Sequence, residues 1–488
     1  MNDLSSSANH EVGCPKNATK NYAKYVFWVM FSISFLNYLD RNVLTGAANV
    51  VAHELGIGID GIGYIASAFL IVYTLFTLPL GIWADRAKRK DVVAISVAIW
   101  SLATAFTALA GNFITLFLSR MVLGIGEAGY FPAGTALMSD YFSRTKRSRI
   151  MSWWSVAQLI GILVGFVIGG ALAGLFVGSW RLAFIFTGIP GLILAFLAWR
   201  LREPRRNEAD EEEIALYPYP YTLDKVAEIE EPHQAIHLTP NVLSQFATLL
   251  RIKTLVVLII MQIFAFFVLG VNVVYLPTFL QQKDIFGLSS GQAGLFSGAV
   301  IVLAGLAGTV FGGYMADWLN RQHQGSRVLV CGIGFILSAP AFALAVTTHS
   351  FIIFTIFFIL TAFLLTIYTG PSTAATQDVV PSVLRATAIA VSLLIAHLLG
   401  DAFAPTLVGT LARMFDPTHG MHFANNMAGR DLAQALLFTC TPALVIAGLV
   451  GIFGARWMKG DVTAAQEADQ LAQAYNEAKS KSTTSRPI

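Results

Sequence analysis

Long apolar segments dominate this sequence and leave few folds open to it. Each holds about the 20 apolar residues that a membrane-spanning helix needs. Only helices and closed barrels can span lipid, and these segments lack the alternation of apolar and polar residues typical of barrel strands. The sequence therefore predicts an all-α polytopic membrane protein with twelve spanning helices, at about 25–51, 62–83, 92–111, 113–138, 150–175, 181–201, 254–281, 291–316, 328–347, 351–371, 386–411 and 433–457.

The composition supports a membrane protein. Of the 488 residues, 55% are apolar and only 12% are charged, which is about half the charged fraction of a typical soluble domain. The longest polar break divides the predicted helices six and six. We expect a cytoplasmic N-terminal segment, two six-helix bundles separated by a cytoplasmic connector, and a cytoplasmic tail, at 1–24, 25–201, 202–253, 254–457 and 458–488.

The basic residues predict the orientation, because cytoplasmic loops carry an excess of Lys and Arg. Most of the 32 basic residues lie on the side of the two termini and the connector. Those that fall on the opposite side are Arg181, Lys283, Arg413 and Arg430. Both termini are therefore expected in the cytoplasm, with the protein in the plasma (inner) membrane.

A charged pattern recurs in the two predicted bundles. Gly81 and Asp85-Arg86 follow the second helix, with Arg89 close behind, and Gly313 and Asp317 follow the eighth, with Arg321 beyond. The sequence predicts a duplication, as in transporters that rock around a midplane site. We expect a cytoplasmic gate, in which these charges pair with the other half and hold the cytoplasmic face closed; a solvated positive loop is the alternative. The gate residues are Gly81, Asp85, Arg86, Arg89, Asp317 and Arg321.

These motifs resemble those of the major facilitator superfamily. Gly81-x-x-x-Asp85-Arg86-x-x-Arg89-Lys90 is similar to its signature loop, except that Lys88 replaces a glycine. Arg120-x-x-x-Gly124-x-Gly126-Glu127 resembles a second motif. The glycine run from Gly161 to Gly170 resembles a third, with Phe166 where antiporters usually have proline. The resemblance implies two pseudo-symmetric bundles and a transport function.

Further motifs resemble those of spinster-type transporters: Asn37-Tyr38-Leu39-Asp40-Arg41, Gly124 to Tyr130, Arg202-Glu203-Pro204 and His397-Leu-Leu-Gly400-Asp401. That family exports lysophospholipids, sphingosine phosphates and related amphiphiles, and some members are proton-coupled. The alternative is the organic anion:proton symporter group for small carboxylates, which shares an Asn-Tyr-Leu-Asp-Arg start and a similar fourth helix. The spinster resemblance implies proton and substrate roles for Asp40, Arg41 and Glu127.

Charged groups inside a bilayer are costly and usually mark function or a tight internal pair. The predicted spans hold six ionisable residues of this kind: Asp40, Arg41, Arg120, Glu127, His397 and Asp401. We predict that Asp40 and Glu127 carry protons and that protonation frees Arg41, whose forked donors suit phosphate or carboxylate. A structural ion pair between the first and fourth helices is the alternative.

The other candidates for substrate binding are charged and neutral polar residues within the spans. Arg120, His397 and Asp401 are the charged ones, although His397 and Asp401 could equally form a buried hydrogen bond. The neutral ones are Gln158, Asn272, Tyr275 and Tyr368. Each of these four could instead make a helix–helix contact.

No nucleotide-binding or metalloprotease motif is found: the sequence lacks a P-loop and HExxH. We therefore predict a transporter rather than an enzyme, with no cofactor, no metal and no nucleic-acid partner. Its expected partners are a small amphiphilic or anionic substrate, protons and membrane lipid, and we expect a monomer. A sensor that binds ligand without moving it remains a further alternative.

Overall fold

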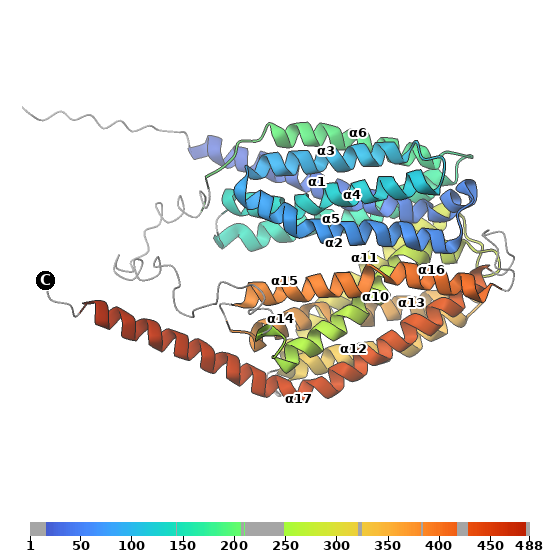
Figure 1. Cartoon of the computed structure of the whole chain (residues 1–488). Helices are drawn as coiled ribbons and strands as arrows, with labels where there is room; N and C mark the ends of the chain where they lie inside the picture. The colour runs from blue at the N-terminus through green and yellow to red at the C-terminus, as the bar shows by residue number, and fades with distance from the viewer. Residues whose placement is uncertain are drawn as a thin grey trace, which may run out of the picture.

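Two groups of helices lie one above the other in the computed structural model (Figure 1). It describes residues 16–142, 144–205, 209, 248–320, 325–381, 384–416 and 428–484, and no strand occurs among them. The first group contains α1 (Lys16–Leu55), α2 (Ile59–Arg86), α3 (Arg89–Thr107), α4 (Phe113–Tyr141), α5 (Arg144–Ala173) and α6 (Trp180–Trp199). The second contains α10 (Lys253–Gln281), α11 (Ser290–Asn320), α12 (Ser326–Thr347), α13 (Phe351–Thr366), α14 (Thr369–Val379), α15 (Arg385–Ala396), α16 (Ala404–Phe415) and α17 (Ala428–Thr484).

Eleven helices in the described part of the chain are long and apolar enough to cross a membrane. Two of them are composite. α13 and α14 together form one candidate span over Phe351–Val379, and α15 and α16 form another over Thr387–Phe415, joined by the π-helical turn η2 (His397–Asp401). α1 is not among the eleven; it holds Asp40 and Arg41 near its middle. The predicted all-α polytopic fold is confirmed.

The last helix is longer than the sequence predicted. We expected a span at 433–457 followed by a polar tail, but α17 continues without a break to Thr484. Its polar extension contacts the second group, because Asp461 accepts a hydrogen bond from the backbone N–H of Thr254 at the start of α10 (2.7 Å). An acidic residue satisfies one of the donors that the first turn of a helix leaves unpaired.

α1 and α5 pack closely because α5 presents glycines to α1. A Cβ atom on Gly165 would lie 2.6 Å from the carbonyl oxygen of Leu39, and one on Gly169 would lie 2.2 Å from that of Val43. Small residues let spanning helices approach to backbone contact. The glycines of α5 therefore let it approach the backbone of α1, and this contact fixes which side of α1 faces α5.

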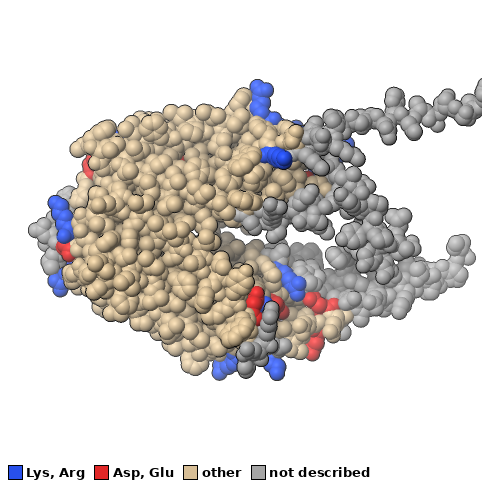
Figure 2. All heavy atoms as spheres, turned by 180° about the vertical axis from the view of Figure 1, so that it is seen from behind, with Lys and Arg blue, Asp and Glu red and all other residues tan. Residues whose placement is uncertain are grey.

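The two groups join at one end of the molecule, which we call the closed end. There Arg413 of α16 donates to Asp60 of α2 (2.8 Å), and the Tyr275 hydroxyl of α10 donates to the carbonyl oxygen of Ile59 at the start of α2 (3.2 Å). α5 meets α11 at Gly170, where a Cβ would lie 2.2 Å from the Ser290 carbonyl oxygen. At the opposite end, where α1 begins and α17 ends, Figure 2 shows a hollow between the groups.

Loop residues near the closed end are also held by charge. Glu54, which lies beyond the predicted span 25–51, pairs with Arg181 and accepts from Trp180 Nε1 and from the Gly178 N–H, both at 2.9 Å. Burial raises the pKa of this carboxyl group, but the hydrogen bonds from Arg181 and Trp180 outweigh burial and hold the pKa below its usual range. The end of α1 is thereby fixed to the start of α6.

Candidate functional site

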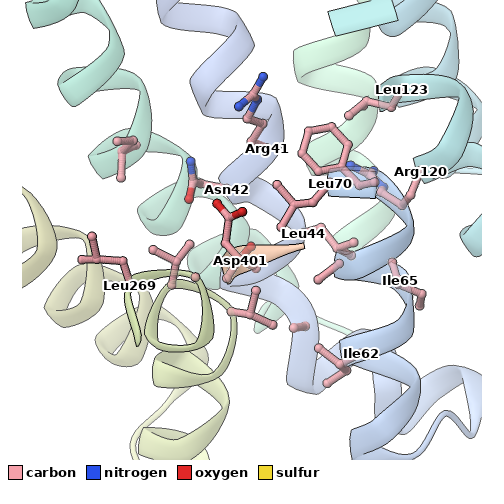
Figure 3. Close-up of a pocket in the computed structure, with 18 of the residues that line it drawn as sticks. Arg41, Asn42, Leu44, Ile62, Ile65, Leu70, Arg120, Leu123, Leu269 and Asp401 are labelled. Carbon is pink, nitrogen blue, oxygen red and sulfur yellow. The ribbon is translucent and has the colours of Figure 1, made fainter. Parts of the chain in front are cut away.

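A cavity of about 360 Å³ lies between the two groups of helices. Its walls come from α1, α2, α4 and α5 on one side and from α10, α11 and η2 on the other. Most of the lining is aliphatic or aromatic, with a few polar side chains, which is the usual make-up of a small-molecule site. Figure 3 shows the polar ones that it labels: Arg41, Asn42, Arg120 and Asp401.

Arg41 forms an ion pair with Glu127 of α4. Its guanidinium also lies against three aromatic rings, 4.5 Å from the ring centre of Tyr73, 5.2 Å from Tyr38 and 5.3 Å from Phe69. In Figure 3 the Arg41 side chain points away from Asp401. Aromatic faces stabilise a cation without neutralising it. Arg41 is therefore bound by one carboxylate and an aromatic pocket, while still lining the cavity.

Glu127 is fully buried, and only one of its two carboxylate oxygens pairs with Arg41. Its Oε1 atom has no hydrogen-bond partner. The neighbouring Gly126 sets its depth, because a Cβ there would lie 2.6 Å from the backbone nitrogen of Trp100, so α4 packs directly on α3. Burying an unpaired carboxylate costs free energy. Either the ion pair with Arg41 or protonation of the carboxyl group would offset that cost for Glu127.

Asp40 faces a different side of α1 from Arg41. It is fully buried and lies outside the cavity lining; the Thr104 hydroxyl donates to its Oδ2 atom (3.4 Å), and the Thr187 side chain also lies near the carboxyl group. Its Oδ1 atom has no partner, and Asp40 makes no ion pair with any described residue. Consecutive helical residues point about 100° apart. The structure thus brings Arg41 to Glu127 and leaves Asp40 behind them, toward α3.

Arg120 lines the cavity from α4 but lacks a carboxylate partner among the described residues. Its side chain is 3% exposed, one guanidinium nitrogen donates to Thr107 (3.0 Å), and the Phe184 ring lies 5.0 Å away. Its Nε atom is buried without a partner. A guanidinium stays charged. The cavity therefore has a positive charge that the protein itself leaves unneutralised by direct contact.

His397 and Asp401 lie opposite, on the η2 turn of the second group. His397 Nδ1 is 3.0 Å and 3.2 Å from the two carboxylate oxygens of Asp401, and the Phe266 ring centre lies 4.7 Å from the imidazole. Both residues line the cavity. Sequence reasoning placed them on one helix face; the structure adds that the turn between them is π-helical, a geometry common at functional sites.

The four neutral candidates do not line the cavity. The Asn272 amide donates to the Val268 carbonyl of its own helix (2.7 Å), and Tyr368 packs on Phe335 with ring centres 5.2 Å apart. Tyr275 is part of the closed end, and Gln158 is half-buried on α5. A substrate role for these residues stays a prediction.

The charges at the other end pair within their own group of helices. Arg89 pairs with Asp140 of α4, and Arg327 of α12 pairs with Asp378 of α14 and with Asp317 (2.9 Å). The partners are 51 residues apart in both Arg89–Asp140 and Arg327–Asp378. Arg327 was missed from the sequence, although the recurrence of Asp140 as Asp378 was the signal that could have found it.

The predicted cross-group pairing of these charges does not occur among the described side chains. Arg86 is exposed, and a Cβ added to Gly81 would lie at an ordinary contact distance from Pro132 (3.8 Å). The side chain of Asp85 and the whole of Arg321 lie outside the described residues. In this conformation Arg89 and Asp317 brace their own halves rather than joining them.

No group of three or more His, Cys, Asp or Glu side chains in the described part of the chain is placed to hold a metal ion. Residues 30–405 match the Major Facilitator Superfamily. The chain belongs to this superfamily. It is an integral membrane protein of a family of transporters, not of enzymes. The major facilitator fold explains the two groups of helices with a cavity between them.

Relatives within the superfamily fall into two kinds. Protein spinster of Drosophila melanogaster is 26% identical over 392 residues, covering 79% of this chain and 61% of that protein, so the chain spans less than two thirds of that relative. A probable L-galactonate transporter of Escherichia coli (strain K12) is 28% identical over 321 residues, covering 65% of this chain and 67% of that protein. The spinster-type resemblance is confirmed, alongside a relation to carboxylate transporters.

A solved structure gives the same fold. The crystal structure of a bacterial homolog to the human lysosomal transporter spinster, inward-facing and unoccupied, superposes with a TM-score of 0.76 at 24% identity, over 91% of this chain and 98% of that one. At this identity the likeness establishes the fold.

Proposed function

We propose that this protein is a proton-coupled secondary transporter that moves an amphiphilic anion, such as a lysophospholipid or a sphingoid phosphate, by alternating access. One observation carries the proposal: a largely apolar cavity between the two groups of helices is lined by Arg41, which pairs with the buried Glu127 behind it, and by Arg120, which has no carboxylate in direct contact among the described residues. The apolar walls suit an acyl chain, and the two arginines suit a phosphate or carboxylate.

Proton coupling follows from competition for Arg41. While Glu127 is ionised, its carboxylate forms an ion pair with the guanidinium of Arg41. When Glu127 is protonated the pair is lost, and the substrate's anionic group becomes the partner of Arg41. Proton and substrate binding are then linked through one residue, as coupling requires. Asp40, fully buried and with one oxygen unpartnered, is proposed as the second proton carrier because its neutral form costs less to bury.

Alternating access requires that the closed end open while the other end closes. The hydrogen bonds at the closed end, such as Asp60–Arg413 and Tyr275–Ile59, join the two groups and must break in that step. The Arg89 and Arg327 pairs lie within single groups, so each half can move as a rigid body. We propose that, in the state in which the closed end has opened, these charges form new ion pairs between the two halves and hold the other end closed.

The proposal also includes the membrane topology of the chain. α1 is taken as the twelfth spanning helix, the six-helix groups are divided by the connector 202–253, and both termini are cytoplasmic. The hollow between the groups in Figure 2 then faces the cytoplasm, and the structure is inward-open. The protein is proposed to act as a monomer in the plasma membrane.

The second candidate is a proton symporter for small carboxylates. The L-galactonate transporter relative favours it, and the same arginines would bind a sugar acid. The two candidates differ in how the substrate uses the apolar walls of the cavity. The acyl chain of an amphiphile would pack against them, whereas a hydroxylated sugar acid would not.

Purified protein in liposomes with an imposed pH gradient tests the proposal. We expect accumulation of a labelled lysophospholipid that collapses when the gradient is removed, with no accumulation of galactonate. Gradient-driven flux of galactonate alone would support the second candidate. Saturable binding without flux of either would make the protein a sensor.

A further inference from the structure

α3 and α6 form the outer side of the first group of helices, and neither lines the cavity. They lie side by side (Figure 1) and pack closely, because a Cβ on Gly188 of α6 would lie 3.0 Å from the backbone carbonyl oxygen of Ser101 in α3. Each helix also presents a row of exposed apolar side chains, spaced so that the row lies on one helix face. The rows are Ile95, Leu102 and Phe106 on α3, and Phe186, Ile189, Ile193 and Phe196 on α6. In an integral membrane protein, such rows lie against lipid acyl chains.

Three cations gather where these two rows end, at the end of the molecule where α1 begins. Arg200 follows Phe196 by four residues and so continues the row of α6. Lys88 is exposed directly before α3, and Lys90 in its first turn donates from Nζ to the Trp199 carbonyl oxygen (3.1 Å). We call Lys88, Lys90 and Arg200 the cation cluster. Trp199 is exposed beside it, and tryptophan is enriched at membrane–water interfaces, so the cluster lies at the level of the lipid head groups.

The nearby acids leave the cation cluster without a direct counter-charge. Glu203 uses both carboxylate oxygens to accept from the backbone N–H groups of Arg89 (2.8 Å) and Lys90 (3.0 Å), which lack a partner within the first turn of α3. Asp91 lies in that turn and complements the helix dipole. No described carboxylate, including these two, forms an ion pair with a member of the cluster. The cluster therefore keeps donors for an external anion.

The duplicated half of the fold lacks the two lysines. Arg89 and Arg327 occupy equivalent positions, because each pairs with the aspartate 51 residues further along the chain. The lysines of the cluster flank Arg89, whereas Ser326 and Val328 flank Arg327. Arg456 is exposed on α17, which packs on α12 as α6 packs on α3. The equivalent surface of the second half is thus less basic, although the fold is the same.

We infer that the cation cluster and the two apolar rows bind an anionic phospholipid of the surrounding membrane, such as phosphatidylglycerol, outside the transport cavity. The lipid phosphate accepts hydrogen bonds from Lys88, from Arg200 and from the two ammonium donors that Lys90 does not use on Trp199. The acyl chains lie along the rows of α3 and α6. A zwitterionic phospholipid gains less, since it brings its own cation to the cluster. The inference goes beyond the proposed function, because this lipid is bound and not transported.

Native mass spectrometry of the full-length protein in detergent resolves the first phospholipid that binds and tests the inference. We expect phosphatidylglycerol to bind at least about tenfold more tightly than phosphatidylcholine of the same chain length, since each cation near a membrane surface raises affinity for an anionic lipid by about fivefold. Glycerol phosphate, which has the anionic group without acyl chains, is expected not to displace it.

Variants assign the preference to the cluster. Lys88→Gln and Arg200→Gln are each expected to lower affinity for phosphatidylglycerol about fivefold, and the double variant about 25-fold. Both side chains are exposed, and surface substitutions of this kind leave a fold intact. Two control variants should keep the first binding step unchanged: Arg456→Gln, on the equivalent surface of the second half, and Arg120→Gln, inside the cavity.

Four outcomes would overturn the inference. These are equal wild-type affinity for the two phospholipids, a preference that survives in the double variant, displacement by glycerol phosphate, and an equal loss in either control. A loss in Arg456→Gln would mean general attraction to basic side chains, and a loss in Arg120→Gln would place the lipid in the cavity. None of these measurements depends on flux, so failure of the inference leaves the proposed transport function intact.

Discussion

The two halves of this transporter are alike at one end and different in the middle. At the end where α1 begins, each half holds an arginine paired with an aspartate 51 residues further along the chain, Arg89 with Asp140 and Arg327 with Asp378. The same ion pair therefore occurs in both halves of the fold. Such a pair would stabilise each helix bundle while the two halves rock against each other.

The cavity is not duplicated in this way. The first half contributes Arg41, Arg120 and Glu127, and the second contributes His397 and Asp401 on a π-helical turn. The comparison teaches that the rim of the fold carries symmetric structural charges, while the chemistry of transport is asymmetric. The first half carries the two arginines and the buried Glu127, and the second carries the acceptor atoms of His397 and Asp401.

The largest effect is expected from Glu127→Gln. The variant keeps the shape of the side chain but leaves Arg41 without its counter-charge and removes the proton site. We expect proton-gradient-driven flux to fall at least about 100-fold, equivalent to about 3 kcal/mol. Substrate exchange across liposomes at equal pH should survive, since Arg41 still binds the anion. Gradient-driven flux at the wild-type rate would remove Glu127 from the coupling mechanism.

Arg120→Gln is expected to have the next largest effect. It removes the cavity cation that lacks a carboxylate partner, so affinity for an anionic amphiphile should fall about tenfold to 100-fold, at about 1.5–3 kcal/mol for a charged hydrogen bond. Binding is measured by calorimetry, with Leu123→Ala on the same wall as the control. An unchanged affinity would show that Arg41 alone binds the anionic group.

A smaller effect is expected from the two equivalent ion pairs, Arg89–Asp140 and Arg327–Asp378, which can be compared directly. The Arg89–Asp140 side chains are 14% and 5% exposed, and those of Arg327–Asp378 are 18% and 35% exposed. Breaking the more buried pair should cost more, so Arg89→Gln is expected to destabilise by about 3 kcal/mol and Arg327→Gln by about 1 kcal/mol. Thermal unfolding in detergent compares them. A larger loss for Arg327→Gln would show that burial does not set the order.

The smallest effect is expected at the closed end. Asp60→Asn weakens an ion pair whose Arg413 side chain is exposed, and exposed ion pairs contribute little to stability. A change of this size shifts a two-state population by up to about fivefold without unfolding either state. Spin labels across α2 and α16 should show a larger fraction of molecules separated at this end. No shift would mean that the backbone contacts around Pro405 hold the closure.

The fold could be predicted from the sequence because eleven of the expected spanning segments are long and apolar enough to cross a membrane, while α1 is identified by its motif as well. Motif spacing also placed Arg41 and Glu127 on helices that meet. The direction of Asp40 was missed, although adjacency to Arg41 on a helix implies divergent faces. Tyr275 was placed in the cavity because α10 is apolar on every side, so its sequence does not reveal which face packs on the other half. The π-helical turn has no local sequence signal.

The central claim is that substrate movement and proton movement are one process. The most direct test measures internal pH in liposomes that contain the protein and a trapped pH-sensitive dye, with no pH gradient at the start. Adding lysophospholipid to one side should change the internal pH in step with lipid flux, and Glu127→Gln should abolish the pH change. Lipid flux with no accompanying pH change in the wild-type protein would contradict the account.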